Sequence, residues 1–281
     1  MMPLPYVIVD VFTDTALHGN QLAVFEDGSA LSGEQMQRLA RELNLSETVF
    51  LLPPEHGGDA RLRIFTPTAE LPFAGHPVLG TAFVVGEARQ LDHLQLETLA
   101  AMVPVQLEME DGRARFGRMR QPIPTWAPYP RQQELLDALG IAGAELPIDA
   151  YENGPTHAYV ALPDVQAVTA LRPNMAALAQ FTALCVSCFA GSGRQWRSRM
   201  FAPALGVTED PATGSAAGPL ALHLARYGRT QFGDEIEIHQ GAEVGRPSVL
   251  YARAQGSEEH VEAIEVAGAA VIVARGEFSR W

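Results

Sequence analysis

An ordered motif occurs twice in this chain, and no other feature of the sequence restricts the fold as strongly. The pattern Arg-x-Phe-x-Pro, followed by Glu-x-Pro-x-x-Gly, occupies residues 63–75 and returns at residues 199–214. The closing glycines, Gly75 and Gly214, are separated by about half of the 281-residue chain. Chance recurrence of turn residues is the alternative explanation, but both parts of the motif recur in the same order. The repeat therefore indicates an ancient duplication that produced two similar lobes.

Each closing glycine is followed by an apolar segment with almost no charge. Residues 76–85 and 215–224 are apolar on nearly every helical face. A helix of this kind is surrounded by other structure. Pro77 suits the first turn of the first helix, whereas Pro219 means that the second helix either starts late or lacks one backbone hydrogen bond. We expect one buried helix at the centre of each lobe.

Strand-like runs dominate the remaining sequence. β-Branched or alternating runs occur, among other places, at residues 6–12, 48–52, 184–190 and 270–275. No regular β-α-β-α alternation connects them, which favours an α+β fold over a doubly wound one. The sequence thus predicts two pseudo-symmetric lobes. Each is a mainly antiparallel or mixed, barrel-like sheet wrapped around a central apolar helix.

A proline-rich segment at residues 121–130 is the best candidate for an interdomain linker. It places an N-terminal lobe at residues 1–126 and a C-terminal lobe at residues 127–281. The last strand can cross back to the first lobe in this scheme. Both lobes are long enough to bury a core of their own.

The charge balance limits the classes of partner. The chain carries 20 basic and 33 acidic residues, a net charge of −13, which argues against nucleic acid or an anionic membrane as a partner. No run approaches the roughly 20 apolar residues of a membrane helix, and the start of the chain does not resemble a signal peptide. We therefore expect a cytoplasmic protein.

The two cysteines, Cys185 and Cys188, form a Cys-x-x-Cys spacing within a strand-like run. A zinc site would need a second pair of ligands nearby. Buried free thiols are the better interpretation, and we expect no metal.

Four polar residues occupy positions that favour chemistry. His76 and Ser215 directly follow the two repeated glycines, Asp210 lies in the expected turn before Ser215, and Glu47 begins a strand. We expect both helix N-termini to face a cleft between the lobes, where their backbone N–H groups would bind a small carboxylate or a developing enolate. Glu47 could shuttle a proton if burial raised its pKa, and His76 should favour its neutral form.

Each of these residues also has a structural explanation. Spacing alone is equally consistent with Ser215 and Asp210 as helix caps and with His76 as a turn residue. A lone Glu47 would by default be a solvated charge at the end of a strand. No phosphate loop, zinc signature or Gly-x-Ser-x-Gly elbow is present in the sequence. The four residues together favour a cofactor-free enzyme that transfers protons on a small carboxylate.

These residues lie in motifs that resemble one known family, and the likeness extends along essentially the whole chain. The sequence resembles the PhzF family of phenazine biosynthesis, which has a diaminopimelate-epimerase-like fold. The motifs that carry the resemblance are Gly19-Asn20, Ser46-Glu47-Thr-Val-Phe, Arg63-Ile-Phe-Thr-Pro, Glu70-Leu-Pro-Phe-Ala-Gly-His76-Pro and Glu209-Asp210-Pro-Ala-Thr-Gly-Ser215-Ala-Ala-Gly-Pro.

The resemblance implies an isomerase that acts on trans-2,3-dihydro-3-hydroxyanthranilate without a cofactor and as a homodimer. Glu47 would move the proton, with His76, Asp210 and Ser215 assisting. The substrate-binding residues would be Asn20, Gly75, Thr213 and Gly214, and the two glycines would donate backbone N–H groups to the carboxylate. Glu70 and Glu209, the matched acids of the repeat, are expected to be structural turn residues.

One departure bears on the reaction type. The related amino-acid epimerases use two cysteine thiols, one beside each helix N-terminus, and the corresponding positions here are Ala74 and Thr213. This argues against two-thiol racemisation. Two other functions stay open at this point: an isomerase or epimerase of the same fold that acts on another small cyclic or amino acid, and a non-catalytic metabolite-binding protein.

Overall fold

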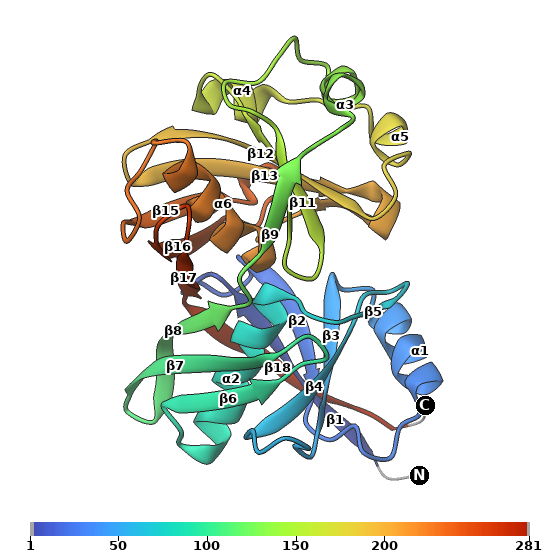
Figure 1. Cartoon of the computed structure of the whole chain (residues 1–281). Coiled ribbons are helices and arrows are strands. Elements are labelled where there is room, and N and C mark those ends of the chain that lie inside the picture. Colours follow the sequence, from blue (N-terminus) through green and yellow to red (C-terminus); the bar gives the residue numbers. More distant parts are fainter. Residues whose placement is uncertain (1–2, 280–281) are drawn as a thin grey trace. The chain divides into compact units, whose positions relative to one another are not determined.

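The computed structural model describes residues 3–279, which form two units (Figure 1). The first unit runs to Arg120 and resumes at Ala267, and Gln121–Val266 form the second. The division thus falls after residue 120, where the sequence suggested residue 126, and the last strand belongs to the first unit. None of the helices within the described residues combines the length and the apolar character that a membrane crossing needs.

The first unit is a β-sheet structure with two α-helices. Its elements are β1 (Leu4–Val11), β2 (Asn20–Phe25), α1 (Gly33–Leu43), β3 (Glu47–Leu52), β4 (Ala60–Phe65), β5 (Glu70–Leu71), α2 (Gly75–Arg89), β6 (His93–Glu97), β7 (Met102–Glu110), β8 (Arg113–Gln121) and β18 (Ala270–Phe278). Strand β18 runs antiparallel to β1, from Phe278 opposite Leu4 to Ala270 opposite Val11. The end of the chain therefore completes the sheet in which the chain began.

The second unit has a similar arrangement with more short helices. Its elements are β9 (Thr125–Pro128), α3 (Gln132–Leu139), β10 (Asp149–Glu152), β11 (Thr156–Ala161), α4 (Val165–Ala170), α5 (Met175–Leu178), β12 (Leu184–Ser192), β13 (Gln195–Ala202), β14 (Val207–Asp210), α6 (Gly214–Arg226), β15 (Glu235–Gln240), β16 (Ser248–Gly256) and β17 (Val261–Gly268), with 3₁₀ turns at Pro203–Leu205 and Ala242–Val244.

The repeated sequence motif corresponds to a repeated strand topology. In the first unit β2 is parallel to β3, β3 is antiparallel to β4, and β4 pairs antiparallel with β5 and parallel with β6. In the second unit β11, β12, β13, β14 and β15 repeat these pairings in the same order and with the same directions. Helices α2 and α6 occupy the same place in this order, each between the short strand and the strand that follows it. The mixed, mainly antiparallel sheets and the pseudo-symmetry agree with the predicted α+β fold.

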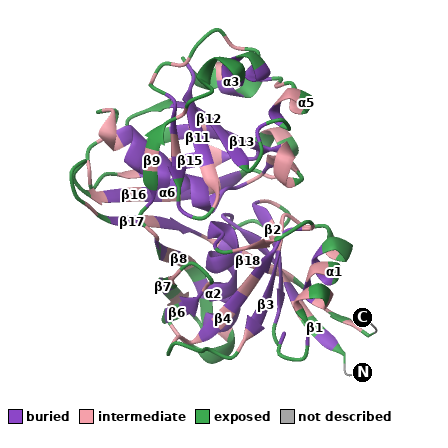
Figure 2. Ribbon diagram, turned by 45° about the vertical axis from the view of Figure 1, so that its right-hand side comes forward, coloured by how far each residue is buried: buried purple, intermediate pink, exposed green. Residues whose placement is uncertain are grey.

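The central helices are buried as their composition requires. Every residue from Gly75 to Gly86 in α2 and from Gly214 to Leu224 in α6 is buried (Figure 2). A Cβ atom built on Gly80 would lie 2.6 Å from Cγ2 of Val11 and 2.8 Å from Cδ2 of Leu22, so α2 passes very close to β1 and β2. Pro219 lies inside α6, so this helix lacks one backbone hydrogen bond.

The other face of each sheet is covered by amphipathic helices. Ser32 caps α1 in a capping box with Gln35, and Asn44 ends the helix in the left-handed conformation, both as the sequence predicts. Met36 of α1 packs in a cluster with Phe25 and Phe50, whose rings stack 4.7 Å apart. In the second unit, α3, α4 and α5 supply Leu135, Val168 and Leu178 to the corresponding cluster.

Two local expectations need correction. Thr125–Pro128, inside the expected linker, form strand β9 and pair antiparallel with β10, so these backbone groups belong to a sheet. Asp210 ends strand β14 and pairs with Met200, where a turn was expected. Both segments are short, and their strand conformation depends on pairing with another strand more than on the residues within the segment. Cys185 and Cys188 are buried free thiols on β12, as expected.

Candidate active site

Three of the expected site residues of the first unit come together at the N-terminus of α2. Glu47 is the first residue of β3, Asn20 is the first residue of β2, and His76 is the second residue of α2. Oε2 of Glu47 lies 3.3 Å from Nε2 of His76. Nδ1 of the same ring is hydrogen-bonded to Nδ2 of Asn20 at 3.2 Å. The imidazole is thereby held between an amide and a carboxylate.

The environment of His76 favours its neutral form. Burial is the main cause that lowers the pKa of His76 to about 3, and a hydrogen bond with the backbone of Gln21 acts in the opposite direction. The side chain of Glu47 keeps 14% of its surface accessible, against 4% for His76. A neutral imidazole beside a partly accessible carboxylate can donate a hydrogen bond, while the carboxylate can still reach a ligand.

Neither central helix has a side-chain cap. The N-cap residues are Ala74 for α2 and Thr213 for α6, and neither side chain bonds to the first turn of its helix. The structure thus places Ala74 and Thr213 at the helix N-termini, where related epimerases have thiols. The N–H groups of Gly75 and Gly214 lie in these first turns and carry the positive end of the helix dipole, which suits an anionic ligand.

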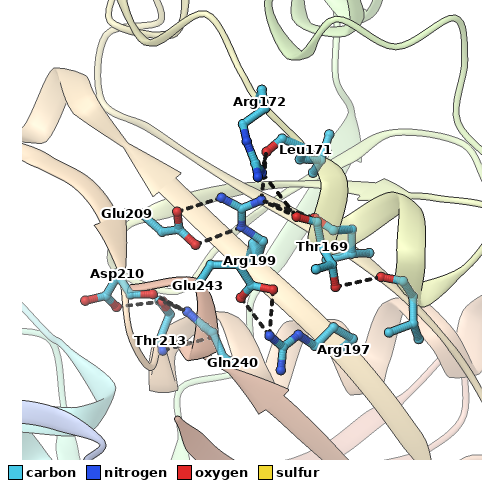
Figure 3. Close-up of polar contacts among 12 residues, drawn as sticks. Thr169, Leu171, Arg172, Arg197, Arg199, Glu209, Asp210, Thr213, Gln240 and Glu243 are labelled. Carbon is cyan, nitrogen blue, oxygen red and sulfur yellow. Dashed lines mark hydrogen bonds and ion pairs between the residues drawn. The ribbon is translucent and has the colours of Figure 1, made fainter. Parts of the chain in front are cut away.

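In the second unit, Asp210 belongs to a hydrogen-bonded cluster with Thr213 and Gln240 (Figure 3). Oγ1 of Thr213 donates to Oδ2 of Asp210 at 2.6 Å and accepts from Nε2 of Gln240 at 2.9 Å. The same amide group donates to the backbone oxygen of Asp210 at 2.8 Å and accepts from the backbone N–H of Thr213 at 3.3 Å. All three side chains are buried. The hydroxyl proton of Thr213 is therefore committed to Asp210, and this residue orients the carboxylate.

Ser215 has a partner that the sequence did not suggest. Its Oγ lies 3.1 Å from Nε2 of His157 on β11, and its backbone oxygen accepts a hydrogen bond of 3.1 Å from Nδ2 of Asn153. Burial lowers the pKa of His157 to about 3, so this imidazole is also neutral. Sequence reasoning missed Gln240 and His157. The segment from Asn153 to His157 leads into β11 as the segment with Asn20 leads into β2, the equivalent strand of the first unit. This correspondence is the sequence signal that could have pointed to His157.

The acidic residues of the repeated motif are held in ion pairs, but they lie on strands β5 and β14 and not in turns as expected. Glu70 accepts two hydrogen bonds of 2.7 Å from Arg63, and Glu209 accepts two of 2.8 Å from Arg199. Arg199 also donates to backbone oxygens at the end of α4, among them that of Leu171 at 2.9 Å (Figure 3). Each of these paired arginine–glutamate contacts, here called a fork, joins the longer strand of the motif (β4 or β13) to the short strand before the central helix (β5 or β14). Within residues 3–279, no three His, Cys, Asp or Glu side chains are grouped as a metal ion would require.

Comparison with solved structures supports the fold. A PhzF-family phenazine biosynthesis protein from Bacillus anthracis superposes with a TM-score of 0.84 over 99% of both chains, at 25% identity. A hydroxyproline epimerase from Agrobacterium vitis superposes with a TM-score of 0.71 over 99% of this chain and 91% of the other. At 15% identity, that second likeness concerns the fold alone.

Comparison with curated sequences identifies the family. A trans-2,3-dihydro-3-hydroxyanthranilate isomerase from Pseudomonas aeruginosa is 56% identical over 271 residues, which cover 96% of this chain and 98% of the relative. An enzyme of the same name from Pseudomonas fluorescens is 52% identical over the same share of both chains. Residues 9–276 match the family described as phenazine biosynthesis-like protein. This chain, with its two repeated units and uncapped central helices, belongs to the phenazine biosynthesis-like (PhzC-PhzF) family.

Proposed function

We propose that this protein is an isomerase that acts on trans-2,3-dihydro-3-hydroxyanthranilate by proton transfer and without a cofactor. The observation that carries the proposal is the position of Glu47, whose carboxylate is 3.3 Å from the neutral His76 at the uncapped N-terminus of α2. The 52–56% identity to relatives of that name supports the choice of substrate.

In the proposed reaction, Glu47 is the base and then the acid. Its carboxylate removes the proton from C3, which carries the hydroxyl group, and the electron pair of that bond forms the C3–C4 double bond. The C4–C5 double bond moves to C5–C6, and the electron pair of the C1–C6 double bond takes up a proton at C1 from the carboxylic acid of Glu47. No electrons enter or leave the substrate. The enol at C3 then tautomerises to an aminoketone that can react with a second molecule.

The other candidate residues bind or orient the substrate in this proposal. His76 and Ser215 donate hydrogen bonds, and the oriented carboxylate of Asp210 accepts one from the amino or hydroxyl group. The N–H groups of Gly75 and of Gly214 are the proposed donors to anionic groups of the substrate, with Asn20 and Thr213 holding the neighbouring polar groups in place. The hydrogen bond between Asn20 and His76 and the one from Thr213 to Asp210 support the orienting roles.

The test is to incubate the purified protein with trans-2,3-dihydro-3-hydroxyanthranilate and to follow the loss of the substrate diene by ultraviolet absorbance. In D₂O, NMR should show deuterium at C1 of those product molecules for which the Glu47 carboxylic acid exchanged with solvent before it returned its proton. Unchanged substrate would overturn the proposal. Exchange on a different cyclic or amino carboxylic acid would instead identify another isomerase of this family, and binding without exchange would identify a metabolite-binding protein.

The residues at the two helix N-termini argue against two-thiol racemisation. The position beside α2 is Ala74, and the hydroxyl group of Thr213 beside α6 is bonded to Asp210.

The family resemblance also supports a homodimer, and we expect the enzyme to act in the cytoplasm. Light scattering after gel filtration tests the dimer, and a monomer mass of about 30 kDa would contradict it.

A further inference from the structure

A buried histidine holds the hydroxyl group of Ser215. His157 is the second residue of β11, and Ser215 is the second residue of α6. The imidazole of His157 has no accessible surface and Ser215 is 5% exposed, so water does not compete for the 3.1 Å contact between Nε2 and Oγ. Burial of a polar ring is costly unless the ring makes a hydrogen bond. Ser215 supplies that bond.

The two nitrogens of His157 are in different situations. Nε2 faces Ser215, whereas Nδ1 is buried and has no hydrogen-bond partner among residues 3–279. A neutral imidazole has one N–H donor and one lone pair. An orphaned buried N–H is rarer in proteins than an orphaned acceptor. The favoured tautomer therefore carries its proton on Nε2 and donates it to Oγ of Ser215.

This tautomer determines what Ser215 can do. A serine oxygen that accepts from His157 keeps its own proton for another partner. At the first turn of α6, that partner would be an acceptor oxygen on an anionic ligand. In the reverse tautomer, Nε2 of His157 would accept the hydroxyl proton of Ser215. The serine oxygen could then only accept a hydrogen bond from a ligand. His157 thus decides whether Ser215 acts as a donor.

The first unit has a corresponding hydrogen bond between a strand side chain and the second residue of its central helix. There Asn20, at the start of β2, is hydrogen-bonded to His76, the second residue of α2. Strands β2 and β11 hold equivalent places in the repeated topology, as do helices α2 and α6. In both units a side chain from the strand orients the second residue of the central helix. This recurrence does not depend on which tautomer His157 adopts.

We propose that His157 is a positioning residue that sets Ser215 as a hydrogen-bond donor to the substrate. The proposal rests on the function proposed above, because it assumes that Ser215 contacts the substrate. His157 itself does not contact the substrate in this scheme and transfers no proton.

A double-mutant cycle on the full-length protein tests the proposal. His157→Phe removes the donor and should lower kcat/KM about tenfold, the effect of one hydrogen bond. Ser215→Ala should have a similar effect, and the double variant should be no worse than Ser215→Ala alone. His157→Gln places an amide donor near the position of Nε2 and should restore most of the activity. If the fold-losses in kcat/KM of the two single variants multiplied in the double variant, the residues would act independently, and the proposal would be overturned.

His223, which lies on α6 with Ser215, is the matched control for His157. It is fully buried, burial lowers its pKa to about 3, and its Nδ1 is 3.2 Å from the hydroxyl group of Tyr151. His223→Phe should change thermal stability but alter kcat/KM less than twofold, with and without Ser215→Ala. Equal coupling of His223 and His157 to Ser215 would mean a general packing effect and would overturn the proposal.

NMR of the ¹⁵N-labelled wild-type protein tests the tautomer without any assay. Long-range ¹H–¹⁵N spectra should show His157 as the Nε2–H tautomer at neutral pH, and Ser215→Ala should perturb its Nε2 signal. The Nδ1–H tautomer would overturn the proposal even in an active enzyme. An inactive wild-type protein with the expected tautomer would instead contradict the proposed function.

Discussion

Oε2 of Glu47 lies 3.3 Å from Nε2 of His76, and the imidazole is hydrogen-bonded on its other side to Asn20. These residues come from the starts of β3, α2 and β2, so rigid elements hold all of them. A carboxylate placed in this way can move a proton over a short distance without a change of backbone conformation.

Replacement of Glu47 by Gln should lower kcat by about 10²–10⁴-fold, because the amide cannot accept and return a proton. The shape of the side chain is retained, so substrate binding should change little. The measurement is the initial rate of ultraviolet absorbance change, with exposed Glu42→Gln on α1 as the control. Wild-type rates in Glu47→Gln would remove this residue from the mechanism.

Thr213→Val should weaken both activity and folding. Valine has a similar shape but leaves Oδ2 of Asp210 and Nε2 of Gln240 without the hydroxyl group that each now contacts. We expect about 1–3 kcal/mol lower free energy of unfolding and about tenfold lower kcat/KM. Thr213→Ser, which keeps the hydroxyl group, should stay close to wild type. Equal losses in the two variants would show that the methyl group matters and not the hydrogen bonds.

The free energy of unfolding should fall as the pH is lowered from about 6.5 toward 3. The pKa values of His76, His157 and His223 fall from 6.5 in the unfolded chain to about 3, mainly through burial. Between these values the unfolded chain binds more protons, so this stabilisation is complete above pH 6.5 and is lost on acidification.

Urea denaturation between pH 7 and 5 measures this dependence before most carboxylates titrate. Each such histidine contributes a slope of up to about 1.4 kcal/mol per pH unit. His223→Gln removes one titrating group and should give a shallower slope than wild type. If the free energy of unfolding changed with pH by the same slope in wild type and His223→Gln, the prediction would be contradicted.

The two arginine–glutamate forks should differ in their contribution to stability. The side chains of Arg199 and Glu209 are 6% and 10% exposed, whereas those of Arg63 and Glu70 are 25% and 27% exposed. Glu209→Ala leaves a buried guanidinium partly uncompensated and should cost about 3–5 kcal/mol. Glu70→Ala should cost nearer 1 kcal/mol, because water replaces the partner. Equal shifts in urea midpoint would refute this ranking.

Gly80→Ala should destabilise the protein although alanine favours helices by about 1 kcal/mol. The new methyl group would lie 2.6 Å from Val11 and 2.8 Å from Leu22, both buried side chains. Overpacking of this kind costs about 1–3 kcal/mol or more, so the net change should be a loss. Gly143→Ala is the control, since no atom lies within 4 Å of its added Cβ. A raised melting temperature for Gly80→Ala would contradict the close packing of α2.

Much of the fold could be predicted because local patterns and the global topology agree. The capping box at Ser32, the left-handed Asn44 and the apolar composition of α2 and α6 depend on neighbours within a few residues. The expected strand-end position of Glu47 and the buried thiols of β12 also hold. Within the predicted linker at residues 121–130, the pairing of Thr125–Pro128 with β10 could not be foreseen, because proline content does not reveal a ladder partner.

The candidate site was predictable only in part. The repeated glycines locate both helix N-termini, and with them His76 and Ser215. The residues that orient these side chains are distant in the sequence: His157 is 58 residues from Ser215, and Gln240 is 27 residues from Thr213. No local spacing connects such pairs.

The sequence by itself determined the two-fold repeat, the buried central helices and the identities of the groups at their N-termini, because these follow from residue type and order along the chain. Tertiary structure decided which groups meet. It paired Glu47 with His76, committed the hydroxyl group of Thr213 to Asp210, and placed His157 against Ser215. Hydrogen bonds act over about 3 Å, and only the folded sheets bring strand and helix residues within that distance.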